Sequence, residues 1–306
     1  MYEALRKGAS VEEINKLTKV KDYFIEQMKE LVDEENALIE KKGAVPAEPV
    51  LRQAKLDGFS DRYLSQILGV SEEDVRTTRE KYGICEAWEG IHVSGTENAA
   101  YYYSTYHDIK DTSPVSDKPK IMILGGGPNR IGQGIEFDYC CVHAALALKK
   151  LGFESIIVNC NPETVSTDYD TSDKLYFEPL TLEDVLAIHA KEKPLGVIAQ
   201  FGGQTPLNLA GDLKKYGVNI LGTSPETIDL AEDRDHFRAM MEKLGIPMPE
   251  SGMAVNVDEA LEIANRIGYP VMVRPSYVLG GRGMEIVHDD EMMKVYMSAA
   301  VGVTPD

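Results

Sequence analysis

Residues 121–134 read IMILGGGPNRIGQG, a short apolar run followed at once by a glycine-rich stretch. Apolar residues in succession are typical of a strand buried on both faces, and glycines directly after it allow a tight turn. A helical pattern follows from about residue 136 to 151 and ends at Gly152. The stretch therefore predicts a strand, a glycine loop and a helix, the opening unit of a parallel α/β sheet.

The same alternation continues further along the chain. Strands are expected at residues 155–159, 197–201 and 219–221. One helix should begin at Thr181, and another should follow Pro206 and end at Gly217. Right-handed crossovers would place the loops after the C-terminal strand ends at one sheet edge, where ligands usually bind. Residues 120–230 are thus predicted to form a Rossmann-like domain.

Residues 1–108 show helical periodicity and no strand alternation. One long helix carries an apolar stripe made of Phe24, Met28, Leu31, Val32, Leu38 and Ile39. Shorter helices are expected after Pro49, Ser60 and Ser71. The pattern predicts an all-helical bundle, joined to the sheet domain by a turn-rich linker at residues 109–119.

Residues 64–83 also have the rhythm of a helix-turn-helix that reads DNA. Its second helix would begin with Glu72, Glu73 and Asp74, where DNA phosphates require positive charge. Arg76 and Arg79 do not offset these acids. A structural or oligomerising helix pair is therefore favoured, and DNA binding is kept as the weaker alternative.

The pattern changes again after residue 230. Helices are expected around residues 233–244 and 258–267, and another near Asp290. Residues 271–287 predict two strands joined by a glycine-bearing loop. Residues 231–306 are only about 70 residues, fewer than the ~100 expected of a complete α+β domain, so a partial domain is predicted.

The composition bounds the function. A chain of 306 residues with 43% hydrophobic and 27% charged residues should form two or three globular domains. No apolar run approaches the ~18 residues of a membrane helix, and the start does not resemble a signal peptide, so a cytoplasmic protein is expected. The net charge of −18 argues against nucleic acid as the main partner. The cysteines, at 85, 140, 141 and 160, lack metal spacing and are expected to be buried thiols.

The glycine loop at residues 125–134 matches no dinucleotide fingerprint. Arg130 stands where the third glycine would be, and residues 159–161 read NCN in place of an acid for a ribose. A Walker A loop is absent as well. Two interpretations of this loop therefore remain, a tight turn with no further role or a loop that approaches a ligand.

A second glycine loop carries arginines. Arg274 precedes a turn formed by Gly280, Gly281, Arg282 and Gly283. Bare backbone at such a turn can approach phosphates while guanidinium groups neutralise them. A purely structural hairpin with exposed arginines is an equal alternative.

Two polar stretches, residues 161–173 and 200–208, follow predicted strand ends and are rich in hydrogen-bonding side chains. The stretches at residues 125–144, 161–173, 202–206, 231–234 and 274–282 resemble, in this order, the second, carbamate-phosphorylating half of the carbamoyl phosphate synthetase large-subunit family. Residues 1–108 are similar to that family's oligomerisation domain. The resemblance implies a helical domain, a pre-ATP-grasp domain at 120–230 and part of an ATP-grasp domain at 231–306.

The resemblance also implies a function. The family makes carbamoyl phosphate, for arginine and pyrimidine synthesis, from bicarbonate, two ATP and ammonia supplied by a small glutaminase subunit. Arg234, Arg274, Gly280, Gly281 and Arg282 are expected to bind ATP, which acts with Mg²⁺ or Mn²⁺. A carbamate channel is expected to involve Gly127, Asn129, Arg130, Asn161, Glu163, Gln204 and Thr205.

By the same resemblance the chain is expected to be an internal fragment, with the metal ligands downstream of residue 306. It would then be inactive alone. An assembly module without catalysis, self-associating through the helical region, remains the alternative function, and neither nucleic acid nor membrane is an expected partner.

Overall fold

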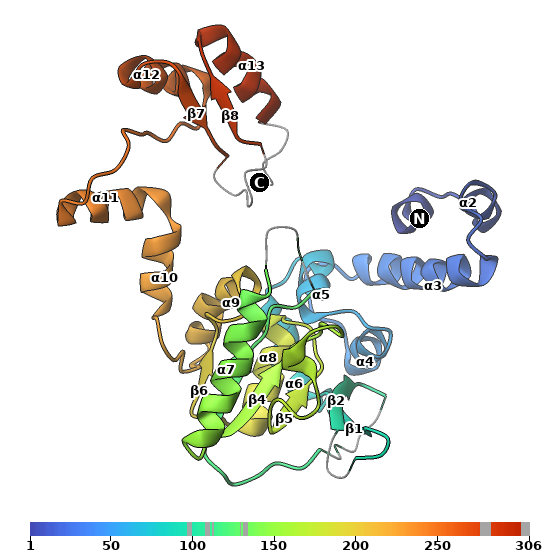
Figure 1. Cartoon of the computed structure of the whole chain (residues 1–306). Helices are drawn as coiled ribbons and strands as arrows, with labels where there is room; N and C mark the ends of the chain where they lie inside the picture. Colours follow the sequence, from blue (N-terminus) through green and yellow to red (C-terminus); the bar gives the residue numbers. More distant parts are fainter. Residues whose placement is uncertain are drawn as a thin grey trace.

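The structure is a computed structural model that describes residues 1–96, 100–107, 111, 113–128, 130, 134–275 and 283–300, with only the backbone of residues 234, 235, 299 and 300. Figure 1 shows a helical N-terminal region, a central sheet with flanking helices and a small C-terminal unit. Within these residues, no helix is both long and apolar enough to cross a membrane.

The N-terminal region is helical up to residue 81. Its helices are α1 (Tyr2–Arg6), α2 (Val11–Thr18), α3 (Asp22–Ile39), α4 (Glu48–Leu56), α5 (Asp61–Leu68) and α6 (Glu72–Lys81). Ser60 and Ser71 cap α5 and α6, because each hydroxyl accepts a hydrogen bond from a backbone N–H of the first turn. The helix starts expected at these serines are correct.

Helix α3 connects two small cores. Ile25 and Val32 pack with α1 and α2, whereas Leu38 packs with α4, α5 and α6. The apolar stripe predicted for this helix is partly wrong, because Phe24 and Ile39 are exposed. The buried face is centred one residue away, on Ile25, Val32 and Leu38, so both side chains lie at its margin.

Residues 87–105 are not helical as expected but form the hairpin of β1 (Ala87–His92) and β2 (Ala100–Thr105). Strand β2 pairs in parallel with β5 (Lys174–Tyr176). Trp88 packs edge to face on Tyr176 with ring centres 5.8 Å apart. Pairing with a strand some 70 residues away decides the conformation here, which local periodicity cannot reveal.

The central sheet has six strands in the order β1-β2-β5-β4-β3-β6. Its remaining strands are β3 (Lys120–Leu124), β4 (Glu154–Val158) and β6 (Gly196–Ile198). All neighbours except β1 and β2 are parallel, as predicted. Strand β5 was not expected, and the strand expected at residues 219–221 is reduced to one bridge between Val197 and Ile220.

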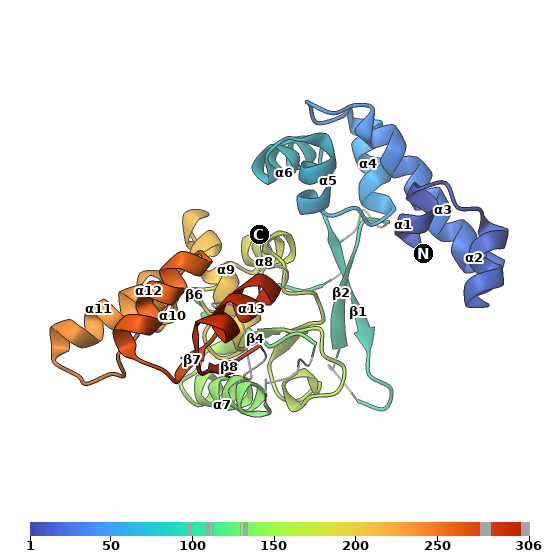
Figure 2. The same ribbon diagram turned by 90° about the horizontal axis from the view of Figure 1, so that it is seen from above.

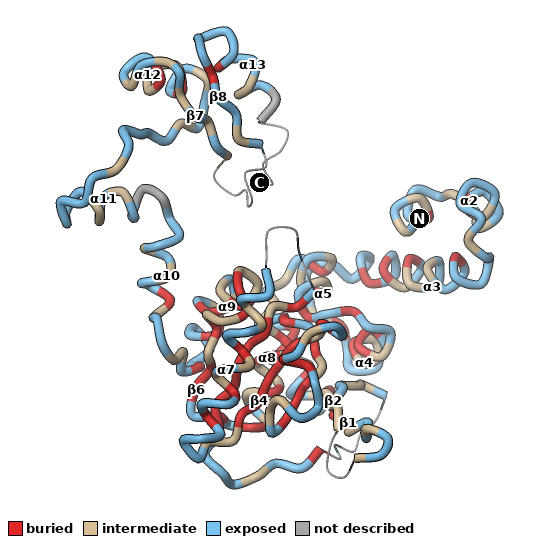
Figure 3. The backbone as a smooth tube through the Cα atoms, viewed as in Figure 1, coloured by how far each residue is buried: buried red, intermediate tan, exposed pale blue. Residues whose placement is uncertain are grey.

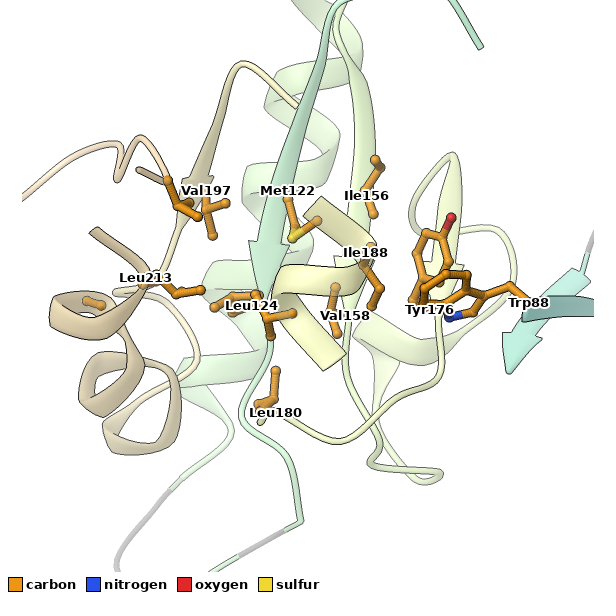
Figure 4. Close-up of a cluster of buried hydrophobic side chains, with 14 residues drawn as sticks. Trp88, Met122, Leu124, Ile156, Val158, Tyr176, Leu180, Ile188, Val197 and Leu213 are labelled. Carbon is orange, nitrogen blue, oxygen red and sulfur yellow. The ribbon is translucent and has the colours of Figure 1, made fainter. Parts of the chain in front are cut away.

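Helices cover both faces of the sheet. Helix α7 (Glu136–Lys150) packs on Ile121 and Ile123, while α8 (Leu182–Glu192) and α9 (Gln204–Lys215) pack on Met122 and Leu124. Alternate residues of one strand thus enter opposite cores. Figure 4 shows the second of these cores, in which Leu124, Val158 and Ile188 converge. Each such side chain contributes about 1.5–3 kcal/mol by burial.

The C-terminal unit follows α10 (Pro225–Glu232) and α11 (Arg234–Leu244). It consists of α12 (Val257–Ile267), β7 (Val271–Val273), β8 (Glu285–Val287) and α13 (Asp290–Ala300). The predicted hairpin is correct, since β7 and β8 pair antiparallel. Figures 1 and 2 show this unit apart from α1–α3, and Figure 3 shows far less burial in α11 than in the sheet.

Candidate functional site

Loops that follow three parallel strands meet at the C-terminal edge of the sheet. Gly125 and Gly126 follow β3, Asn159 follows β4, and Gly202 comes after β6. A Cβ atom on Gly202 would lie 2.2 Å from the carbonyl oxygen of Gly125, and one on Gly125 would lie 2.5 Å from Asn159 Cγ. These contacts leave no room for a side chain, so the glycines are required for the close approach of the loops.

Asn159 connects two of these loops. Its Oδ1 accepts a hydrogen bond from the Gly127 N–H at 2.9 Å, and its Nδ2 donates to Ser166 Oγ at 3.1 Å. The asparagine is 1% exposed. From the sequence, Asn159 stands only where a ribose-binding acid would be expected, and no role was predicted for it. The signal in the sequence was an amide side chain directly after an apolar strand.

The stretch after Asn161 is an ordered turn. Asn161 Oδ1 accepts a hydrogen bond from the Glu163 N–H at 3.0 Å, and its carbonyl accepts one from the Thr167 hydroxyl at 2.7 Å. Asn161 is buried, whereas the side chain of Glu163 is exposed. Gly127 and Asn161, both predicted channel residues, are therefore brought to one edge.

The other predicted channel residues are spread around this edge. Gln204, at the start of α9, donates from Nε2 to Asn208 at 2.9 Å and to Glu232 at 3.2 Å. The Thr205 hydroxyl is buried and has no hydrogen-bond partner within the described part of the chain. Arg130 is exposed, and Asn129 lies outside the described residues.

The predicted nucleotide loop can be followed only at its ends. Arg274 follows β7 and is exposed, and a Cβ on Gly283 would lie 3.3 Å from Pro275 Cγ, so the two stems approach closely. The Tyr296 hydroxyl donates to the Gly283 carbonyl at 2.5 Å. Gly280, Gly281 and Arg282 lie outside the described residues, and the same holds for the side chain of Arg234.

Within the described ranges of the chain, no group of three or more His, Cys, Asp or Glu side chains is placed to hold a metal ion.

The arginines on which a DNA-reading α6 would depend are buried. Arg76 is 8% exposed, and its guanidinium carbon lies 4.1 Å from the ring centre of Tyr216. Arg79 is 2% exposed and donates from Nε to Asp61 at 2.7 Å. Helix α6 therefore packs inward with its arginines, which disfavours contact with DNA phosphates.

The expectation of buried cysteines is only partly correct. Cys141 is buried against the sheet, and burial raises the pKa of its thiol to about 12. Cys160 is half-buried, while Cys85 and Cys140 are exposed. Cys140 neighbours Cys141 on α7, but one helical step of about 100° moves it off the face that meets the sheet.

Comparison with known families is consistent across the chain. Residues 117–230 match the carbamoyl phosphate synthase preATP-grasp domain, residues 1–83 the oligomerisation domain of the carbamoyl-phosphate synthetase large chain, and residues 233–305 the ATP binding domain of the carbamoyl-phosphate synthase L chain. The sheet domain with its glycine-rich edge is thus of the preATP-grasp class.

Relatives extend this match to nearly the whole sequence. The chain is 53% identical to the carbamoyl phosphate synthase large chain of Archaeoglobus fulgidus and 52% identical to that of Myxococcus xanthus, each over 99% of its length. It belongs to the carbamoyl phosphate synthase large-chain family. It spans 29% and 28% of the length of these two relatives.

Among solved structures, the chain is similar to the biotin carboxylase domain of Hydrogenobacter thermophilus 2-oxoglutarate carboxylase. The TM-score is 0.46 at 23% identity, over 61% of this chain and 42% of that one.

Proposed function

We propose that this chain forms part of the large subunit of a glutamine-hydrolysing carbamoyl phosphate synthetase, in the half that phosphorylates carbamate. The observation that carries the proposal is the identity of 52–54% to carbamoyl phosphate synthase large chains over 99% of the chain. The whole enzyme would use bicarbonate, two ATP and ammonia from a small glutaminase subunit, and would serve arginine and pyrimidine biosynthesis.

In the proposed step a carbamate oxygen attacks the γ-phosphorus of ATP. The bond from that phosphorus to the β,γ-bridging oxygen breaks, and ADP leaves. Arg234 and Arg274 would bind the phosphates, Gly280 and Gly281 would cover them with backbone, and Arg282 would assist. Charge neutralisation and positioning are the main sources of rate in such transfers. The divalent ion, Mg²⁺ or Mn²⁺, is assigned no ligand in this chain.

The sheet edge would serve the same reaction as a passage for carbamate. Its proposed lining is Gly127, Asn129, Arg130, Asn161, Glu163, Gln204 and Thr205. The close approach of the glycine loops and the buried polar groups beside them support this proposal. A protected path would limit hydrolysis of a reactive intermediate.

A nucleotide titration tests the ATP assignment. Millimolar Mg-ATP should raise the melting temperature of the chain, and Arg274→Ala should abolish the rise. Arg266→Ala is the matched control, because Arg266 is an exposed arginine of the same unit on α12. A rise that survives Arg274→Ala would contradict the assignment. The chain alone should not release ADP in the presence of carbamate, since it spans under a third of its relatives.

Self-association is the second candidate function, favoured by the match of residues 1–83 to an oligomerisation domain. Helix α3 exposes Tyr23 and Phe24, whose rings contact edge to face at 5.4 Å. Sedimentation of the whole chain and of Phe24→Lys tests whether this face participates. The control is Phe237→Lys on α11, which is also exposed.

A further inference from the structure

The glycine loop after β3 is held at both stems by one small set of hydrogen bonds. At its start, the Gly127 N–H donates to Asn159 Oδ1 at 2.9 Å. At its end, Asp138 in the first turn of α7 accepts from the Ser166 N–H at 3.1 and 3.3 Å. Ser166 Oγ in turn accepts from Asn159 Nδ2 at 3.1 Å. Asn159 and Ser166 thus connect the two stems.

The geometry points to Asn159 as a positioning residue that sets the spacing between the glycine loop and the 161–167 turn, an inference that rests on the proposed carbamate passage. Asn159 is not one of the residues proposed to line the passage. It acts through Gly127 and Ser166, which belong to the two loops that would line the passage.

An amide suits this position for a physical reason. The Gly127 N–H needs an acceptor and Ser166 Oγ accepts a donor here, and the amide carries both kinds of group. Asn159 and Ser166 are 1% and 0% exposed, so water cannot replace a lost partner easily. Gly125 approaches Asn159 so closely that the amide also fixes the backbone path directly after β3.

Strand β4 offers a matched control at its opposite end. Ser155 is also 1% exposed, and its Oγ donates to Asp173 at 2.9 Å. Ser155→Ala therefore removes the hydrogen bonds of a buried side chain in the same strand without touching the C-terminal edge. Any general loss of stability should appear in both variants.

Hydrogen exchange of the 306-residue chain tests the contact itself. Asn159→Ala should speed exchange of the Gly127 amide on the order of fivefold, the value of one hydrogen bond, while Ser155→Ala leaves it unchanged. Asn159→Asp should restore protection, because a carboxylate can accept from both Gly127 N–H and the Ser166 hydroxyl. Unchanged Gly127 exchange in Asn159→Ala would overturn the inference. If that variant does not fold, Ser166→Ala should speed exchange at residues 165–167, and no change there overturns it.

The effect of Asn159 on the proposed carbamate passage is tested in the complete large subunit that contains these residues. The measured quantity is how tightly ATP consumption is coupled to carbamoyl phosphate formation. The ratio of ATP consumed to carbamoyl phosphate formed should rise at least about twofold in Asn159→Ala, because carbamate lost from a loosened passage is hydrolysed. Ser155→Ala should keep the wild-type ratio. Faster Gly127 exchange with an unchanged ratio would reject the passage at this edge. A raised ratio with unchanged exchange would keep the passage and reject Asn159 as its positioning residue.

Discussion

Lys55 of α4 and Glu183 of α8 lie 2.5 Å apart, Nζ to Oε1, although 128 residues separate them in the chain. Their side chains are 2% and 9% exposed. Glu183 Oε2 also accepts the Asp61 N–H at 2.7 Å, so this one carboxylate holds α5 as well. Buried ion pairs are costly to desolvate, and their value lies in a specific docking geometry, here of the helical region on the sheet domain.

Removing the cation Lys55 should lower the free energy of unfolding more than removing the charge of Glu183. The buried ion pairs join the carboxylates Asp61, Glu86 and Glu183 to the cations Lys55 and Arg79. Lys55→Met leaves three acids against one cation and should cost about 3–5 kcal/mol. Glu183→Gln leaves two of each and should cost only about 1–2 kcal/mol.

Urea unfolding followed by the fluorescence of Trp88, the single tryptophan, measures both effects. Lys214→Met is the control, because Lys214 forms an exposed pair with Glu226 at 2.5 Å. Its cost should stay below about 1 kcal/mol. Equal costs for Lys55→Met and Lys214→Met would contradict the role of the buried pair.

Glu192 should make the fold sensitive to acid. Burial alone would raise the pKa of Glu192, but hydrogen bonds from Lys120, Lys174 and Tyr176 outweigh it and lower that pKa below its ordinary 4.5. The stabilisation is therefore present above pH 4.5 and is lost as the pH falls below it. Glu192→Gln should be strongly destabilising at pH 7, with a smaller difference from wild type at pH 3.5. Unfolding free energies at the two pH values measure this, and an equal difference at both would refute it.

Asp184 should have the opposite effect on the pH dependence of stability, destabilising the fold as the pH rises. Burial, with the nearby carboxylates of Glu178 and Glu183, raises the pKa of Asp184 from 3.8 to about 7. Since the unfolded state ionises first, stability should fall between pH 3.8 and 7 and level off above that. Asp184→Asn removes this slope and can still accept the Thr181 hydrogen bond, so it should be more stable than wild type at pH 8. Similar stability of the two at pH 3 is the internal control, and a wild type more stable at pH 8 would reject the assignment.

Thiol labelling should separate neighbouring cysteines. Cys85 and Cys140 are exposed and should react with a maleimide in the native chain. Cys141 is buried with its pKa raised to about 12, so it should react only after unfolding, because the thiolate is the reactive form. Peptide mapping by mass spectrometry distinguishes the sites. Native labelling of Cys141 at the rate of Cys140 would contradict the packing of α7.

Local sequence determined much of the sheet domain and the hairpin of the C-terminal unit. The strand and helix at residues 120–150, the Thr181 cap of α8 and the β7–β8 hairpin could all be predicted. Each depends on a pattern within a few residues, namely an apolar run, a capping hydroxyl or a glycine turn. The glycines at the sheet edge were likewise visible as candidates.

Only the tertiary structure decided which side chains work together. The β1–β2 hairpin depends on pairing with β5, and Arg79 is held by an aspartate 18 residues away rather than by a ligand. Asn159 was missed because its partner Gly127 lies 32 residues earlier. Sequence patterns report local conformational preference, whereas hydrogen-bond partners and burial depend on the chain's three-dimensional path, which brings distant residues together.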